Sequence, residues 1–94
     1  MRIPKSTKRF RRDYKRIKKS GKDIEKLKAI MLRLIQKKTL PSEFNDHQLH
    51  GKWKYLRDCH VEGDWILLYE LGVDNNNNET ITFHATNNHE NLFG

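Results

Sequence analysis

The sequence predicts an α+β fold in which an N-terminal helical hairpin packs on an antiparallel sheet of three to four strands. Two observations indicate this fold. Apolar residues recur with a helical period up to about residue 38 and with a period of two after residue 52. The charge changes along with the period: residues 1–38 hold 16 Lys or Arg against 3 Asp or Glu, a formal +13, whereas residues 39–94 hold 3 against 9, a formal −6. Because 94 residues suffice for one core, we expect a single domain spanning residues 1–94.

The basic first half is expected to form two amphipathic helices, over residues 8–19 and 24–38. The first carries a narrow apolar face, and the wider apolar face of the second predicts that it is more buried. Ser6 or Thr7 is expected to cap the first helix and Gly21 to end it. Asp23 is expected to cap the second helix, and the short junction makes the pair an antiparallel hairpin. Ahead of the helices, Ile3 is a candidate for a short strand at an edge of the sheet.

Three segments of the second half are expected to be strands. Residues 53–61 alternate between apolar and polar side chains, and residues 65–71 are apolar on both faces, which is typical of a central strand covered on two sides. Residues 79–86 alternate again, and three apolar side chains are expected on one face of this strand: Ile81, Phe83 and Ala85. Residues 39–52 are interpreted as a loop. One face of the sheet is left available for something other than the helices.

The titratable residues of the second half predict a site for proton transfer. His60 ends one predicted strand and Asp64 begins the next, so the hairpin between them makes these residues neighbours. His89 follows the last predicted strand and can reach His60 and Asp64 only if that strand pairs beside the central one. His47 lies in the loop before the first of the three predicted strands. Acid–base cleavage of RNA needs such a set, because one group deprotonates the 2′-hydroxyl and another protonates the leaving 5′-oxygen. The alternative is that these are solvated polar residues at strand ends.

Metal binding is a weaker interpretation of the same histidines. His47 and His50 are three residues apart, a spacing that zinc sites use, but a closed zinc site needs four ligands. The single cysteine, Cys59, lies in a predicted strand, and no His-Glu-x-x-His helix accompanies the two histidines. We therefore expect no metal and no other cofactor.

The charge of the first half exceeds what solubility requires and favours a surface for nucleic acid or for an acidic partner. Trp65 and Phe93 are candidates for stacking on unpaired bases, although a tryptophan that opens an apolar strand is more often a core residue. No stretch of sequence is apolar over the length needed to span a membrane, and the N-terminus lacks the apolar segment of a signal peptide. A cytoplasmic protein without membrane contact is the expectation.

Two motifs resemble those of the RelE/YafQ group of bacterial toxins. The run DHQLHGKWKYLRDCHVEGDWILLYEL and the ending HENLFG match that group's D-H-x-L-x-G-x-W loop, its R-D-x-H-V-x-x-D-W segment and its final H-x-x-L-F. The resemblance implies a RelE/ParE-like fold and a toxin that inhibits translation by cleaving mRNA on the ribosome. It also implies metal-free chemistry, in which the 2′-hydroxyl attacks the adjacent phosphate and leaves a 2′,3′-cyclic phosphate.

The resemblance assigns roles to individual positions. Four residues match catalytic positions: His47, His60, Asp64 and His89. Trp65 and Phe93 match positions that shape the substrate pocket. One departure lies in the last strand, where relatives usually carry an arginine against the scissile phosphate and this chain carries Ala85. Arg57 or a lysine of the first half is expected to supply that charge, and His50 to add a cation nearby.

The resemblance implies partners and leaves alternatives. An acidic antitoxin is expected to wrap the basic helices. The same helices are expected to contact 16S ribosomal RNA. Contact with operator DNA is expected only through the complex with the antitoxin. One alternative is a ParE-like gyrase poison of the same fold, against which the histidine set argues. A second is a catalytically weakened protein that only binds its antitoxin, which Ala85 leaves open. A basic nucleic-acid-binding module is a third, and it leaves the hairpin residues unexplained.

Overall fold

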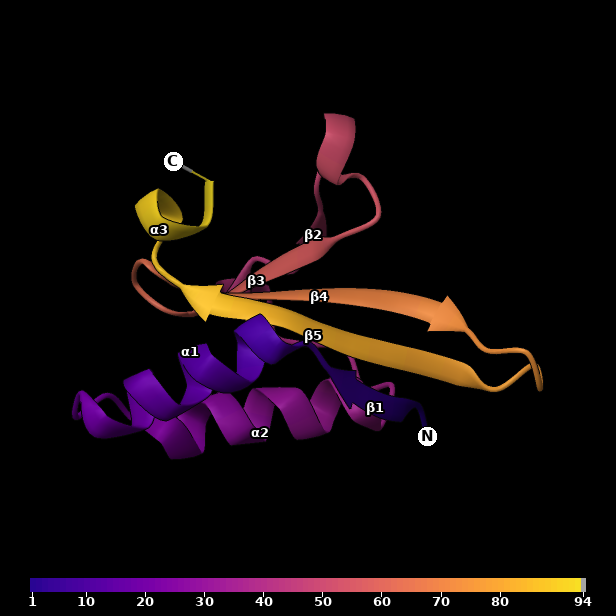
Figure 1. Cartoon of the computed structure of the whole chain (residues 1–94), viewed down its shortest axis with the longest axis horizontal. Helices are drawn as coiled ribbons and strands as arrows, with labels where there is room; N and C mark the ends of the chain where they lie inside the picture. Colours follow the sequence, from indigo (N-terminus) through magenta and orange to yellow (C-terminus); the bar gives the residue numbers. More distant parts are fainter. Residues whose placement is uncertain (94) are drawn as a thin grey trace.

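The structure is a computed structural model that describes residues 1–93, and it contains a sheet with a helical hairpin on one face (Figure 1). Its helices and strands are β1 (Ile3–Ser6), α1 (Lys8–Lys19), α2 (Ile24–Ile35), β2 (His47–Gln48), β3 (Arg57–Glu62), β4 (Trp65–Val73), β5 (Glu79–Asn87) and α3 (His89–Phe93), with the 3-10 turns η1 (Ser42–Phe44) and η2 (Gly51–Trp53). The predicted α+β class and the helical hairpin on the sheet are confirmed.

The sheet has five strands in the order β1-β5-β4-β3-β2 and is mixed rather than purely antiparallel. The edge strand β1 pairs in parallel with β5, from Ile3 opposite Thr80 to Ser6 opposite Phe83, and the other pairs are antiparallel. The prediction of three to four antiparallel strands was therefore incomplete. Its missing member is β2, a two-residue strand that pairs with the start of β3 inside the segment interpreted as a loop.

The two helices begin where their capping residues predict. The Thr7 hydroxyl accepts a hydrogen bond from the backbone N–H of Phe10 at 3.0 Å, and the Asp23 carboxylate accepts one from Lys26 at 3.2 Å. The second helix ends at Ile35 rather than at residue 38, and Lys37 takes a left-handed conformation with φ of +63°. Apolar side chains of both helices and of the sheet form the helix-side core: Phe10, Ile17, Leu27, Ile30, Leu34, Leu40, Cys59, Val61, Trp65, Leu67, Tyr69, Ile81 and Phe83.

Two details of the sheet differ from the alternation that the sequence predicts. The pairing of β4 with β5 shifts between Leu68, opposite Ala85, and Tyr69, opposite Phe83, which leaves His84 as the extra residue of a β-bulge. Ala85 therefore packs on the face opposite the helices, and the prediction that it shares a face with Phe83 was wrong. The strand predicted from residue 53 begins only at Arg57, because Trp53 belongs to the turn η2.

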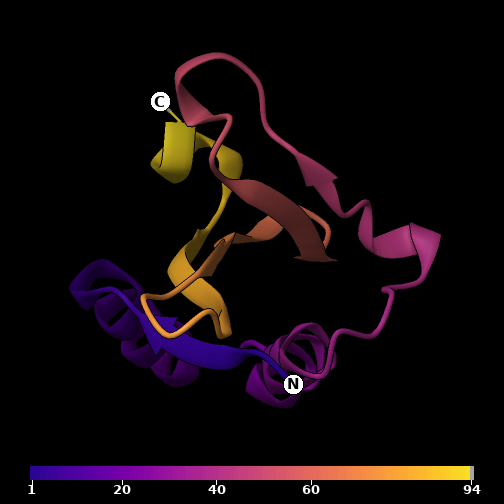
Figure 2. The ribbon, with the colours of Figure 1, turned by 90° about the vertical axis from the view of Figure 1, so that its right-hand side faces the viewer.

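The second face of the sheet, here called the open face, is only partly covered. A small cluster of Leu56, Ile66, Leu68 and Ala85 lies on it, and Leu49, Trp53, Leu92 and Phe93 pack against this cluster. Figure 2 shows the segment that carries η2 and the short helix α3 together on this side of the sheet. Within residues 1–93, no helix has the length and apolar character that crossing a membrane requires.

Candidate functional site

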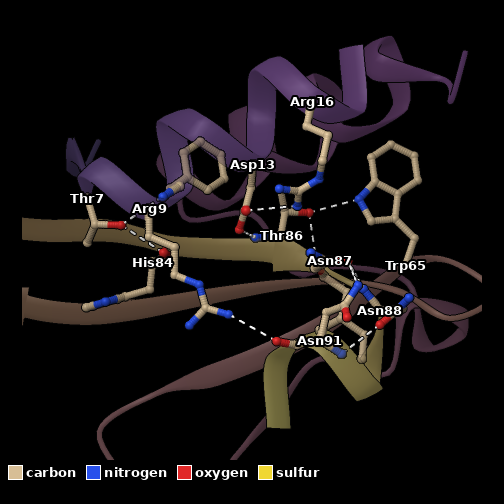
Figure 3. Close-up of polar contacts among 12 residues, drawn as sticks. Thr7, Arg9, Asp13, Arg16, Trp65, His84, Thr86, Asn87, Asn88 and Asn91 are labelled. Carbon is tan, nitrogen blue, oxygen red and sulfur yellow. Dashed lines mark hydrogen bonds and ion pairs between the residues drawn. The ribbon is translucent and has the colours of Figure 1, made fainter. Parts of the chain in front are cut away.

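Strand pairing brings Asp64 and His89 to one end of the sheet. In the register of β4 and β5, Ile66 lies opposite Asn87, so Asp64, in the turn before β4, and His89, the first residue of α3, each lie two residues beyond that pair. A buried network beneath them holds this end of the sheet against α1 (Figure 3). The indole N–H of Trp65 donates to the Thr86 hydroxyl at 2.8 Å, and the backbone N–H of Thr86 donates to the Asp13 carboxylate at 3.1 Å.

The Asp64 carboxylate orients the ring of His89. Its Oδ1 accepts the backbone N–H of His89 at 3.1 Å and lies 3.0 Å from Nδ1 of the same residue. These hydrogen bonds, the backbone one first, hold the pKa of Asp64 below its ordinary value, so the carboxylate is ionised near neutrality. Because an ionised carboxylate only accepts, Nδ1 of His89 carries the proton and Nε2 is left for another partner.

His60 and Phe93 flank His89. The ring centroids of His60 and His89 are 5.7 Å apart with an interplanar angle of 65°, and the ring of Phe93 is 5.7 Å from His89 on α3. His60 comes from β3, on the same face of that strand as Asp58. The two imidazoles thus come from β3 and from the start of α3, which follows β5. The pairing of β5 beside β4, which was the condition for His89 to reach His60, is present.

Asp58 is a site residue that the sequence analysis missed. It is 2% exposed, and its Oδ1 lies 3.2 Å from Nδ1 of His47, which donates its hydrogen to the Asn45 carbonyl at 2.7 Å instead. Within the described residues that carboxylate oxygen has no hydrogen-bond partner. Burial raises the pKa of Asp58, while the nearby imidazoles of His47, His60 and His89 act in the opposite direction. The spacing of Asp58 and His60 at i and i+2 on one strand was the available signal.

The structure thus gathers the four residues predicted to be catalytic around the end of the open face. His47, His60 and His89 all act electrostatically on Asp58, and Asp64 bonds to His89. Within residues 1–93, however, no group of three or more His, Cys, Asp or Glu side chains is arranged to hold a metal ion.

Two of the residues predicted to bind substrate, Trp65 and Arg57, lie on the helix side of the sheet. Trp65 is 3% exposed and belongs to the helix-side core, which agrees with the alternative that a tryptophan opening an apolar strand is a core residue. Nε of Arg57 donates to the hydroxyl of Tyr69 at 3.2 Å and lies 3.5 Å from the Asp46 carboxylate, on the helix side of β3. His50 is exposed at the start of η2. Phe93, by contrast, lies beside His89 of the cluster, as predicted for a residue of the substrate pocket.

The fold and this cluster define a class of small, basic α+β proteins with imidazoles and carboxylates gathered at one end of a sheet. Within that class, the chain belongs to the YafQ family: the family model described as bacterial toxin of type II toxin-antitoxin system, YafQ, matches residues 2–94. The chain is similar to the mRNA interferase toxin YafQ of Escherichia coli strain K12, with 42% identity over 86 residues that cover 90% of this chain and 88% of the relative.

Solved structures support the same assignment. The Escherichia coli DinJ–YafQ complex contains a chain with 39% identity and a TM-score of 0.86, and the match covers 100% of both chains. A copper-bound mutant toxin from Helicobacter pylori has 31% identity and a TM-score of 0.89, with 99% of this chain and 100% of that chain covered. The family resemblance and the RelE/YafQ-like fold that the motifs predicted are confirmed.

Proposed function

We propose that this toxin is an endoribonuclease that inhibits translation by cleaving messenger RNA on the ribosome. The observation that carries the proposal is the Asp64–His89 pair, which lies beside the ring of His60 and in which Nε2 of His89 has no hydrogen-bond partner among residues 1–93. Two imidazoles from adjacent parts of a sheet can serve the two ends of one phosphodiester, since each moves one proton. The name of the Escherichia coli relative, an mRNA interferase toxin, points to the same substrate.

The reaction that this arrangement suits is an internal transesterification. His60 takes the proton of the ribose 2′-hydroxyl as that oxygen bonds to phosphorus, and His89 gives a proton to the departing 5′-oxygen. The products are a 2′,3′-cyclic phosphate and a 5′-hydroxyl, and no water or cofactor is consumed. His47 lies beside the buried Asp58 and is proposed to contact the phosphate where the phosphorane develops negative charge. Asp64 acts as a positioning residue, because its pKa is lowered and it keeps the His89 ring in one orientation.

Partners follow from the charge of the first half and from the relative. The formal +13 of residues 1–38 suits both ribosomal RNA and an acidic antitoxin, and each attraction is expected to weaken with salt. YafQ of Escherichia coli forms a complex with DinJ, and we propose an antitoxin of comparable role for this chain. An mRNA substrate on ribosomes makes the cytoplasm the proposed site of action.

Mapping the 5′ ends of transcripts after a short pulse of expression tests this proposal. The expected result is cleavage of translated mRNA in frame with codons, with 5′-hydroxyl ends that appear only when ribosomes are active. The variant His89→Gln, at an exposed position, serves as the matched inactive control. DNA damage without transcript cleavage would instead indicate a gyrase poison and would overturn the proposal, as would intact transcripts during growth arrest.

A further inference from the structure

A groove of about 220 Å³ lies on the open face beside the proposed catalytic cluster, and the proposed reaction does not use it. Its lining includes Trp53, Leu56, Ala85 and Phe93, with Arg9 at its border. The groove is continuous with the cluster, because Phe93 lines it and also packs its ring 5.7 Å from that of His89. A ligand that extends from the histidines along the open face would therefore enter it.

Arg9 reaches the open face from the opposite layer of the molecule. The strand β1 pairs with β5 only as far as Phe83, and the backbone N–H and the hydroxyl of Thr7 then donate to the carbonyls of Phe83 and His84 at 3.0 and 2.8 Å. These bonds start α1 at the edge of β5. The side chain of Arg9 passes around that edge, and its Nη2 donates to the Asn91 carbonyl of α3 at 3.3 Å (Figure 3).

The groove combines aromatic walls with positive charge. The rings of Trp53 and Phe93 meet edge to face with centroids 5.3 Å apart, and Nζ of Lys52 lies 4.7 Å from the Trp53 ring. Among the described residues, no carboxylate lines the groove, and Arg9 forms no ion pair. The carboxylate of Glu70 lies nearby but bonds to His84 at 2.8 Å. An anionic ligand with a planar apolar part suits this lining.

The size of the groove limits the ligand. Pockets for drug-sized molecules occupy roughly 300–1,000 Å³, so about 220 Å³ holds one base rather than several nucleotides. Ala85 forms part of the floor and is itself buried. A larger side chain at this position would fill space that a base would otherwise take.

We propose that this groove is the subsite for the nucleotide next to the cleaved linkage, with its base against Trp53 and Phe93 and its phosphate held by Arg9. The proposal rests on the proposed endoribonuclease activity. Arg9 thereby supplies a cation beside Ala85, the position where the resemblance called for an arginine, and Arg57 does not, because it is bonded to Tyr69 on the helix side of the sheet. Arg9 is a substrate-binding residue, and Ala85 determines which base fits.

The test compares Arg9→Gln with Arg12→Gln by the kcat/KM of cleavage of ribosome-bound mRNA. Arg12 is an exposed residue of the same helix that does not line this groove. Arg9→Gln is expected to lower kcat/KM about tenfold or more, equally at all cleavage sites, with partial recovery in Arg9→Lys, because a charge-assisted hydrogen bond to phosphate is lost. Arg12→Gln removes the same charge from the same helix and therefore measures the general loss of attraction to ribosomal RNA, so the loss of kcat/KM in Arg9→Gln is expected to exceed the loss in Arg12→Gln.

Ala85→Leu tests the base-binding half of the proposal. Filling the floor is expected to change which base follows or precedes the cut, as read by end mapping, while antitoxin binding is retained. If thermal melting shows that Ala85→Leu does not fold, Trp53→Leu, which enlarges the groove, is mapped instead. The proposed subsite would be refuted if Arg9→Gln and Arg12→Gln lost kcat/KM equally. It would also be refuted if the folded groove variant cut with an unchanged base preference. If the original protein itself cut no RNA, the proposed function would fail instead.

Discussion

The two faces of the sheet are formed by the same strands, but they differ in whether their buried carboxylates are hydrogen-bonded. On the helix side, the buried Asp13 carboxylate accepts a backbone N–H from Thr86 and a guanidinium hydrogen from Arg16 at 2.9 Å. On the open face, an oxygen of the buried Asp58 has no hydrogen-bond partner among residues 1–93. A satisfied buried carboxylate is typical of a scaffold, whereas an unsatisfied one is typical of a site where charge is used.

Neighbouring residues fall on opposite sides of this division. Trp65 is sealed into the helix-side core, while Asp64, directly before it, is exposed and bonds to His89. Arg57 bonds to Tyr69 below the sheet, while Asp58, directly after it, lies among the histidines. A single step along the chain thus separates residues that hold the fold from residues that we propose act on a substrate. Substitutions on the two faces are expected to separate loss of cleavage from loss of stability.

The largest effect is expected from His89→Ala. Removing one acid–base group is expected to reduce the rate of mRNA cleavage by about 10²–10⁴-fold, while the free energy of unfolding changes little because the side chain is exposed. Single-turnover cleavage on purified ribosomes and urea unfolding measure the two quantities. A variant that cleaves at the original rate would remove His89 from the site.

Trp65→Ala is the counterpart on the helix side. Loss of a buried indole and of its hydrogen bond to Thr86 is expected to destabilise the fold by about 3–5 kcal/mol, so that activity falls through unfolding. Urea unfolding, monitored by circular dichroism, measures the decrease in the free energy of unfolding. A stable Trp65→Ala variant without cleavage would contradict the division, since it would give Trp65 a direct role with substrate.

Asp58→Asn is expected to lower cleavage and to raise stability at neutral pH. The pKa of Asp58 in the folded state is raised above its ordinary value of 3.8, so its ionised form disfavours the folded state and this penalty grows as pH rises through the raised pKa. The advantage of Asp58→Asn in unfolding free energy should therefore be absent below pH 3.8 and increase above it. Unfolding measured from pH 3 to 7 checks this; an advantage that shrinks with rising pH would refute it.

Arg57→Gln is expected to have the smallest effect. The substitution removes one hydrogen bond to Tyr69 and an ion pair with Asp46, which costs about 0.5–1.5 kcal/mol of stability. Cleavage per folded molecule is expected to be unchanged, because the guanidinium lies on the helix side. Equilibrium unfolding and ribosome-bound cleavage, compared with Arg12→Gln, test both statements. Abolished cleavage in a stably folded Arg57→Gln variant would restore it to the site.

Much of the architecture could be predicted because its signals are local. Helical periodicity with capping residues Thr7 and Asp23 predicted α1 and α2, and an apolar run predicted the central strand β4. The bulge at His84 and the turn at Trp53 could not be predicted in this way. A bulge inserts one residue into an otherwise regular alternation, and its stability depends on partners from other strands rather than on its own sequence.

The sequence by itself determined the order of the helices and the family and supplied the candidates for proton transfer, because periodicity, motif spacing and residue chemistry are all read along the chain. Only the tertiary structure decided which face each strand residue occupies. That choice placed Trp65 and Arg57 on the helix side and drew Asp58 into the histidine cluster. The physical reason is the two-residue period of a strand: a shift of one residue, in register or at a bulge, moves every following side chain to the other face.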